Sequence, residues 1–174
     1  MNKDIIIITE GEFDAKVLQK LLKDRKLPVK YEILSAYGYS SALSKVKSLM
    51  TIRNNKIILL LDTDTIEKNE IRQKEDFVNS YVNTNLIKDN FKTFWSIPEF
   101  EIIFLDNKKF LTELTHKKFN KDFLDLAKTS PRRTLESISK KTREEFIKLL
   151  DKKEIRDEFF KSGLIKEICD YIEK

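Results

Sequence analysis

Hydrophobic and polar positions follow two different patterns along the chain. Up to about residue 97, the pattern predicts strands at 4–9, 31–36, 57–61 and 91–97, and the runs at 5–8 and 57–61 are apolar without interruption. The amphipathic segments between these runs predict helices from Phe13 to about Arg25, at 40–50 and at 67–84. Strands that are apolar throughout, with helices between them, are typical of a parallel sheet covered on both faces.

From residue 100 onward the pattern is helical only. It predicts short amphipathic helices at 100–105, 108–115, 120–127, 131–139, 142–151 and 153–173, the last with a break near Gly163. Ser130 before Pro131 is a good helix start, because proline is favoured at the first helical position. We therefore expect a domain at 1–106 that carries the chemistry and a helical extension at 107–174 that acts as an appendage or lid.

The composition indicates a globular protein with a highly charged surface. The chain has 174 residues, of which 40% are hydrophobic and 36% charged. It contains no run of about 18 apolar residues, which a membrane span requires. The short apolar run at the N-terminus ends in acids and has no small-residue cleavage site, so it does not resemble a secretory signal. These features predict a soluble, cytoplasmic protein.

The excess positive charge lies in the last third of the chain. Residues 1–106 carry 16 basic and 16 acidic side chains, whereas residues 107–174 carry 18 basic and 13 acidic ones. Such a cluster suits the phosphate backbone of a nucleic acid, although a solvated lysine-rich face has the same composition. The candidate nucleic-acid contacts are Lys16, Lys108, Lys109, Lys117, Lys118, Arg132 and Arg133.

Acidic residues follow two of the predicted strands. Glu10 ends the first strand, with Asp14 one helical turn later, and Asp62 and Asp64 end the third. In a parallel sheet both groups leave at the same edge, where α/β proteins build their sites. Residues two apart in an extended segment point the same way, so we expect Asp62 and Asp64 to present their carboxylates to one spot.

Converging carboxylates indicate a bound cation. Two like charges about 4 Å apart repel by roughly 4 kcal/mol at an effective dielectric near 20, so a cluster needs protons or a metal ion. Oxygen ligands without histidine or cysteine favour Mg²⁺ or Mn²⁺, which usually also bind substrate phosphates. His116 is the only histidine and is far from these motifs, so no serine-histidine-acid triad can form. Taken singly, each acid could instead be a helix cap.

The order of these motifs resembles the Toprim domain, which occurs in topoisomerases, bacterial primases, recombination mediators, OLD-family nucleases and small stand-alone bacterial proteins. The matching residues are Thr9–Asp14 (TEGEFD), Leu61–Asp64 (LDTD) and a glycine, Gly38, after the second strand. The resemblance covers roughly residues 3–100. It implies a Rossmann-type α/β fold with a mostly parallel four-stranded sheet flanked by helices, here followed by a helical extension.

The resemblance also implies roles for the acids. Glu10 would be a general acid or base or a metal ligand, Asp62 and Asp64 would be catalytic and bind Mg²⁺, and Asp14 would join them as in the nuclease branch. The segment Ile97–Glu101 (IPEFE) is similar to a stretch that follows the core in some stand-alone and OLD-like members, which adds Glu101 as a candidate ligand. Thr65-Ile66-Glu67 departs from the topoisomerase and primase pattern, which argues against strand passage and priming.

These inferences predict a Mg²⁺- or Mn²⁺-dependent nuclease that cleaves DNA or RNA. Among the functions that the resemblance implies, we favour a phage-defence effector or toxin with an ATPase partner, and the alternative is a ribosomal-RNA-maturing ribonuclease. A second hypothesis is a non-catalytic module that binds nucleic acid or a partner protein. A phosphotransfer receiver domain fits poorly, because no fifth strand is visible. The oligomeric state stays open, a homodimer included.

Overall fold

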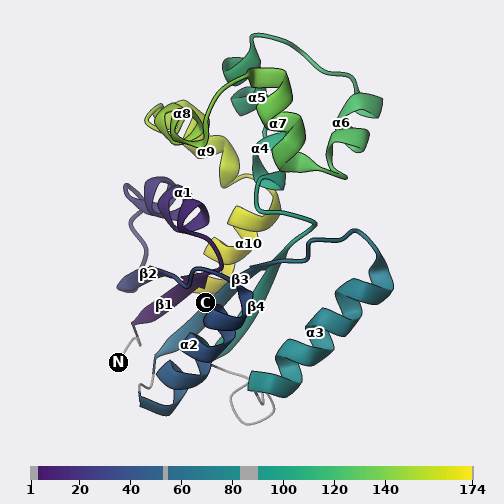
Figure 1. Cartoon of the computed structure of the whole chain (residues 1–174). Coiled ribbons are helices and arrows are strands. Elements are labelled where there is room, and N and C mark those ends of the chain that lie inside the picture. Colours follow the sequence, from purple (N-terminus) through teal and green to yellow (C-terminus); the bar gives the residue numbers. More distant parts are fainter. Residues whose placement is uncertain (1–3, 53–54, 83–89, 174) are drawn as a thin grey trace.

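Four parallel strands form the centre of the molecule. The structure is a computed structural model that describes residues 4–52, 55–82 and 90–173. The strands are β1 (Ile5–Thr9), β2 (Tyr31–Ser35), β3 (Lys56–Asp62) and β4 (Phe91–Ser96). They pair in the order β2-β1-β3-β4, with every pair parallel. The predicted parallel α/β sheet is therefore confirmed (Figure 1).

Helices cover both faces of this sheet. The side chains of Ile6 and Ile8 pack with α2 (Tyr39–Ile52) and α3 (Lys68–Val82). Ile5 and Ile7 point to the opposite face, toward α1 (Glu12–Leu22). This alternation follows from the period of two in a strand, and it explains why β1 is apolar at every position. The last two residues of the predicted 67–84 helix lie outside the described residues.

The C-terminal helix α10 (Gly163–Ile172) completes the face that carries α1. The connection from β1 to β2 runs one way along the sheet, while those from β2 to β3 and from β3 to β4 run the other way. Because crossover connections between parallel strands are right-handed, α2 and α3 lie on one face of the sheet and α1 lies on the other. The face beside β4 on the side of α1 is filled by α10, where the rings of Tyr171 and Phe94 lie 5.9 Å apart.

The remaining helices gather beyond the carboxyl ends of the strands (Figure 1). They are α4 (Ile102–Asp106), α5 (Lys108–Thr115), α6 (Lys121–Ala127), α7 (Pro131–Ser139), α8 (Arg143–Leu149) and α9 (Lys153–Phe159). A cluster of contacting rings from Phe104, Phe110, Phe146 and Phe159 joins α4, α5, α8 and α9. This cluster is continuous with the apolar core under β1 and α1, so the helical extension packs directly on the sheet domain.

The bounds of some helices differ from the sequence prediction. Helix α1 ends at Leu22 rather than at about Arg25, and α2 spans Tyr39–Ile52 rather than 40–50. The turn before α2 is made by Tyr37 and Gly38, both with positive φ.

Within the described residues, no helix combines the length and the apolar character that crossing a bilayer demands.

Candidate functional site

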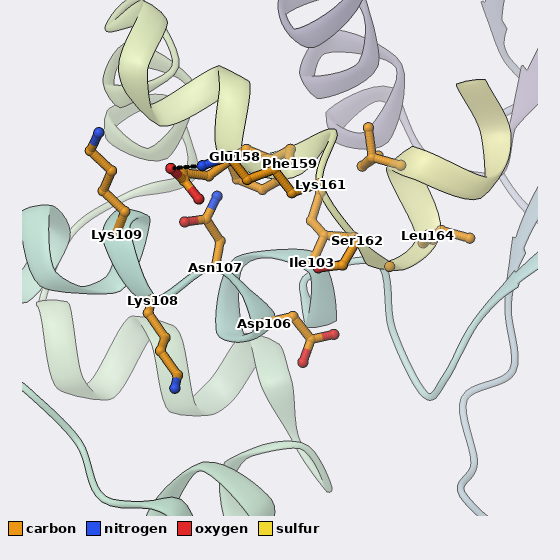
Figure 2. A pocket seen from close by; sticks show the side chains of 12 residues that line it. Ile103, Asp106, Asn107, Lys108, Lys109, Glu158, Phe159, Lys161, Ser162 and Leu164 are labelled. Carbon is orange, nitrogen blue, oxygen red and sulfur yellow. Dashed lines mark hydrogen bonds and ion pairs between the residues drawn. The ribbon is translucent and has the colours of Figure 1, made fainter. Parts of the chain in front are cut away.

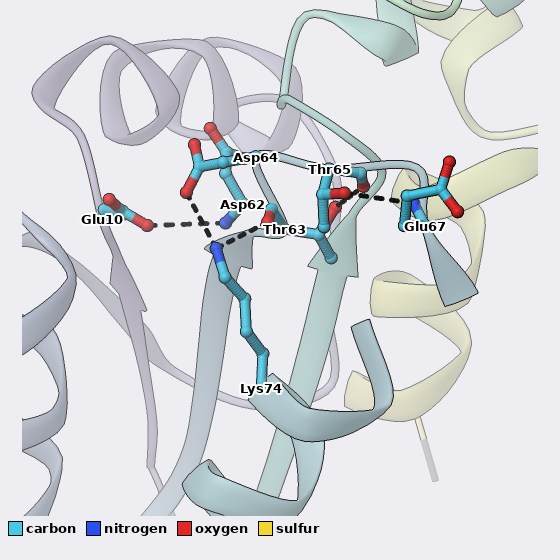
Figure 3. Close-up of polar contacts among 7 residues, drawn as sticks. All are labelled: Glu10, Asp62, Thr63, Asp64, Thr65, Glu67 and Lys74. Atoms are coloured by element: carbon cyan, nitrogen blue, oxygen red, sulfur yellow. Dashed lines mark hydrogen bonds and ion pairs between the residues drawn. The ribbon is translucent and has the colours of Figure 1, made fainter. Parts of the chain in front are cut away.

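Glu10 and Asp62 meet at the carboxyl edge of the sheet. β1 and β3 are neighbours in register, so the residues that follow them leave side by side. The backbone N–H of Glu10 donates to the carbonyl of Leu60 at 3.2 Å, which extends the pairing by one residue. The backbone N–H of Asp62 in turn approaches Glu10 Oε2 at 3.5 Å (Figure 3). The parallel register therefore brings these two acids together, as the sequence predicts.

Asp14 is held beside them by the first turn of α1. Its side chain is buried, and its Oδ2 accepts a hydrogen bond from the backbone N–H of Gly11 at 3.0 Å. Gly11 has a φ of −108°, which any residue can adopt. A Cβ atom at this position would lie 3.1 Å from Asp14 Oδ2. A side chain at position 11 would therefore crowd the Asp14 carboxylate, which would have to shift by a few tenths of an ångström.

Glu101 enters the site from the segment before α4, paired with a cation that the sequence analysis missed. Its side chain is 4% exposed and forms an ion pair with Arg143 from α8. The Arg143 guanidinium also lies over the ring of Phe13, 4.6 Å from its centroid. Arg143 Nε is buried and has no hydrogen-bond partner within the described parts of the chain. No local sequence signal links two residues that are 42 positions apart.

These residues line one pocket with a volume of about 380 Å³. We call it the carboxylate pocket and define it by Glu10, Asp14, Asp62, Glu101 and Arg143. Its acids come from the ends of β1 and β3, the first turn of α1 and the segment before α4. Four predicted site residues that are distant in the sequence are therefore brought together.

The pocket holds its acids in an environment that opposes their ionisation. Burial, reinforced by the charges of Asp14, Glu10 and Glu101, raises the pKa of Asp62 to about 8. Burial also raises the pKa of Asp14 to about 6, although the hydrogen bond from Gly11 acts the other way. The pKa of Glu10 is raised as well, chiefly by burial. Clustered carboxylates with too little compensating positive charge are what a cation site requires.

Asp64 departs from the predicted geometry. The strand ends at Asp62, and Asp64 has a left-handed backbone with a φ of 53° rather than an extended one. Its side chain is 69% exposed and its Oδ2 pairs with Lys74 Nζ at 3.0 Å (Figure 3). The expectation that Asp62 and Asp64 point to one spot because both are extended is therefore wrong. Aspartate tolerates this backbone region because its short side chain bonds locally.

Asp64 lines a neighbouring pocket of about 530 Å³, which we call the arginine pocket. Arg132 and Arg133 at the start of α7 contribute to it, as does Glu99. The Glu99 carboxylate accepts the backbone N–H of Arg132 at 3.1 Å, so it caps α7. Two of the predicted nucleic-acid contacts thus lie beside Asp64.

The other predicted basic contacts are spread over different surfaces. Lys16 lines the carboxylate pocket but pairs with Glu12 at 2.9 Å. Lys108 and Lys109 line a separate pocket of about 310 Å³ between α5 and the turn that joins α9 to α10 (Figure 2). Lys117 and Lys118 line another one, after α5. The last four of these lysines, Lys108, Lys109, Lys117 and Lys118, do not line the carboxylate pocket.

The acids provide the oxygen ligands that a hard divalent cation prefers, but their side chains are not arranged as a complete coordination shell around one ion. Among residues 4–52, 55–82 and 90–173, no three acidic, histidine or cysteine side chains are placed to ligate one ion together. Mg²⁺ usually takes only one or two protein carboxylates and keeps several waters. The pair formed by Glu10 and Asp62 meets that smaller requirement, and both provide oxygen ligands.

Comparisons with known proteins give a limited result. No family model matches the sequence. No curated protein matches it either. Two solved structures are similar, both of the C-terminal region of the OLD protein from Xanthomonas campestris pv. campestris, one phased with mercury and one with platinum. Each is 13% identical, with TM-scores of 0.46 and 0.45; the matches cover 97% and 99% of this chain and 94% and 92% of those chains.

Proposed function

We propose that the protein is a divalent-metal-dependent phosphodiesterase that cleaves nucleic acid at the carboxylate pocket. One observation carries the proposal. The side chains of Glu10, Asp14, Asp62 and Glu101 converge in one pocket at the carboxyl edge of a parallel sheet. That edge is where α/β folds bind ligands, and a set of oxygen donors there suits Mg²⁺ or Mn²⁺.

Glu10 and Asp62 are the residues that would hold the ion, with Asp14 and Glu101 beside them. A bound divalent ion in such a site supplies charge stabilisation to a phosphoryl oxygen and a nucleophilic water at neutral pH. The hydrogen bond from Gly11 keeps Asp14 oriented into the pocket. Without an ion, burial disfavours charge on Glu10, and a bound divalent cation would offset that cost.

Arg143 has a separate function in this proposal. In the structure it neutralises Glu101, and its own side chain stays 34% exposed beside the carboxylate pocket. A guanidinium suits a phosphate oxygen, because its planar fork donates two parallel hydrogen bonds. We assign Arg143 to the scissile phosphate, and Arg132 and Arg133 in the arginine pocket to neighbouring phosphates of the same strand.

A second candidate is a non-catalytic binding module. The ion pairs Lys74–Asp64 and Arg143–Glu101 favour it, because each neutralises an acid without any metal. The biological setting belongs to the proposal as well: a phage-defence effector or toxin paired with an ATPase, or a ribosomal-RNA-maturing ribonuclease. Both settings need the same chemistry at Asp62.

Cleavage of a mixed nucleic-acid panel separates the two candidates. Plasmid DNA, single-stranded DNA, transfer RNA and structured RNA are incubated with Mg²⁺ or Mn²⁺ and with wild type, Glu10→Gln or Asp62→Asn. Asp125→Asn is a matched control, because Asp125 is an exposed acid of α6 outside the pocket. Metal-dependent cutting that is lost in the first two variants and kept in the control supports the nuclease. Binding without cutting, equal in all four proteins, supports the module.

A further inference from the structure

A group of aromatic side chains lies along α2 and α3, which cover the face of the sheet opposite α1. We define the aromatic patch as Tyr39 at the start of α2 with Phe77 and Tyr81 on α3. The Phe77 residue is 52% exposed. Its ring stacks on that of Tyr81, with 6.0 Å between centroids and an interplanar angle of 29°. Lys47 Nζ lies over the Tyr81 ring, 4.8 Å from its centroid.

The core of the protein does not need the ring of Phe77. Helix α3 buries Val78 and Val82 against the sheet, and most of its other residues are polar. Phe77 follows Lys74 by three positions, so both side chains share the outward face of the helix. A single exposed apolar residue needs no explanation, but a set of rings beside a candidate catalytic site does.

The patch is coupled to the site by short contacts. The backbone N–H of Gly38 donates to the carbonyl of Glu10 at 2.9 Å, and Tyr39 is the next residue. Burial, with a smaller contribution from the charge of Glu10, raises the pKa of Tyr39, so the phenol lies within electrostatic reach of that carboxylate. Lys74 spans the gap, because its Nζ lies 5.9 Å from the Tyr39 centroid and 3.0 Å from Asp64 Oδ2.

The space at the patch fits a flat ring with a polar rim. A pocket of about 540 Å³ is lined by Tyr39 and Phe77 together with Glu70, Gln73 and Lys74. Two aromatic side chains offer faces for stacking, while an amide and a carboxylate can pair with the donors and acceptors on the edge of a base. Lys74 adds the positive charge that a phosphate beside that base requires.

From this arrangement we propose that the aromatic patch binds an unpaired base next to the scissile phosphate, so the preferred substrate is single-stranded nucleic acid or a single-stranded segment of a longer one. In a duplex the bases are stacked inside and cannot reach the pocket, whereas an unpaired base can stack on any aromatic face. This inference rests on the proposed function, because it assigns the substrate class of the same site.

The test measures base stacking without cleavage. Single-stranded oligonucleotides that carry 2-aminopurine, whose fluorescence is quenched on stacking, are titrated with protein in EDTA. Phe77→Ala and Tyr39→Leu remove an aromatic face, and Ile52→Ala is the control, because Ile52 is 76% exposed at the far end of α2. Loss of one stacked base weakens binding by about 5- to 150-fold. We expect quenching by wild type and the control, and weaker binding with less quenching in the two patch variants.

Cleavage of matched single-stranded and blunt duplex substrates then distinguishes the two ideas. If wild type cleaves the single strand preferentially and Phe77→Ala loses that preference, both the nuclease and the base-binding function of the aromatic patch are supported. If wild type cleaves both substrates equally and Phe77→Ala does the same, the base-binding function is overturned and the nuclease is retained. If wild type cleaves neither substrate with any metal but its binding depends on Phe77, the nuclease is overturned and the base-binding function is retained.

If neither Phe77→Ala nor Tyr39→Leu changes oligonucleotide binding, and Phe77 is needed instead for a protein complex, the aromatic patch binds a protein partner and the inference is overturned. Melting curves show whether each variant is folded.

Discussion

Asp62 and Asp64 are two residues apart, yet they lie in opposite environments. Asp62 ends β3 and faces three other acids in the carboxylate pocket. Asp64 has left the strand, is exposed, and has a lysine partner. The two side chains have the same chemistry, so their surroundings decide which one lacks a compensating cation: Asp62 is buried among acids, whereas Asp64 is exposed beside Lys74. We therefore expect Asp62 to be the indispensable ligand and Asp64 to support it from the rim.

The largest expected effect is on cleavage. Asp62→Asn should lower the rate by on the order of 10²- to 10³-fold, as loss of one charge-stabilising group does. Asp64→Asn should cost about 10-fold, in the lower range for residues that act through a ligand. Initial rates on one labelled oligonucleotide at saturating Mn²⁺ measure both. Equal losses in the two variants would show that Asp64 ligates the ion directly.

Metal binding should show the same contrast without any substrate. An ion present at 100 times its dissociation constant stabilises a protein by about 2.7 kcal/mol, which corresponds to roughly 5–10 °C in Tm for a chain of this length. We expect Mn²⁺ to raise the Tm of EDTA-treated wild type and of Asp64→Asn, but not of Asp62→Asn. Differential scanning fluorimetry with and without Mn²⁺ measures these shifts. If Mn²⁺ still raises the Tm of Asp62→Asn, the ion binds outside the carboxylate pocket.

Without metal, the two substitutions should change stability in opposite directions. Asp62→Asn removes a charge from a buried acidic cluster, so it should raise the free energy of unfolding by about 1 kcal/mol. Asp64→Asn removes an exposed ion pair with Lys74 and should lower it by less than about 1 kcal/mol. Urea denaturation in EDTA at pH 8 measures both values. Destabilisation by Asp62→Asn would mean that its carboxylate is already compensated in the folded protein.

The stability difference at Asp62 should depend on pH. Its pKa is about 8 in the folded protein and that of Asp14 is about 6, both above the ordinary aspartate value. A raised pKa means that the folded state binds protons more tightly, so this contribution to stability is fully present below the ordinary aspartate pKa of 3.8. It falls as pH rises and is lost at about 6 for Asp14 and about 8 for Asp62. Urea denaturation in EDTA across pH 5–9 should therefore show the advantage of Asp62→Asn over wild type growing up to about pH 8 and constant above it. A constant advantage would contradict the clustering.

Much of the fold could be predicted from the sequence, because continuous apolar strands and alternating helices specify a parallel sheet. The meeting of Glu10 with Asp62 followed from the same rule, since parallel strands end at one edge. The position of α10 over β4 could also have been inferred. One-handed connections leave that face open, and Phe94 needs a cover there.

The remaining features depend on tertiary contacts that no local pattern contains. The turn at Asp64 is stabilised from outside its own segment, by a hydrogen bond from its backbone N–H to the carbonyl of Pro98 at 2.8 Å. Arg143 reaches Glu101 only because the ring cluster of the helical extension packs α8 against α1. Counting charges located a basic region, but it could not tell the arginines near Asp64 from the lysines on other surfaces.

The smallest predicted effect tests whether Asp64 is only a supporting residue. Lys74→Gln removes the cation that pairs with Asp64, and it should cost less than about 1 kcal/mol of stability, because the Asp64 side chain is largely exposed. If Asp64 is a rim residue, freeing its carboxylate leaves the Mn²⁺ concentration for half-maximal Tm shift unchanged. A lower midpoint would show that Lys74 competes with metal for Asp64. Asp64 would then be a ligand of a second metal ion. Its difference from Asp62 would arise because Lys74 occupies its carboxylate, not because the carboxylate is too far from the metal.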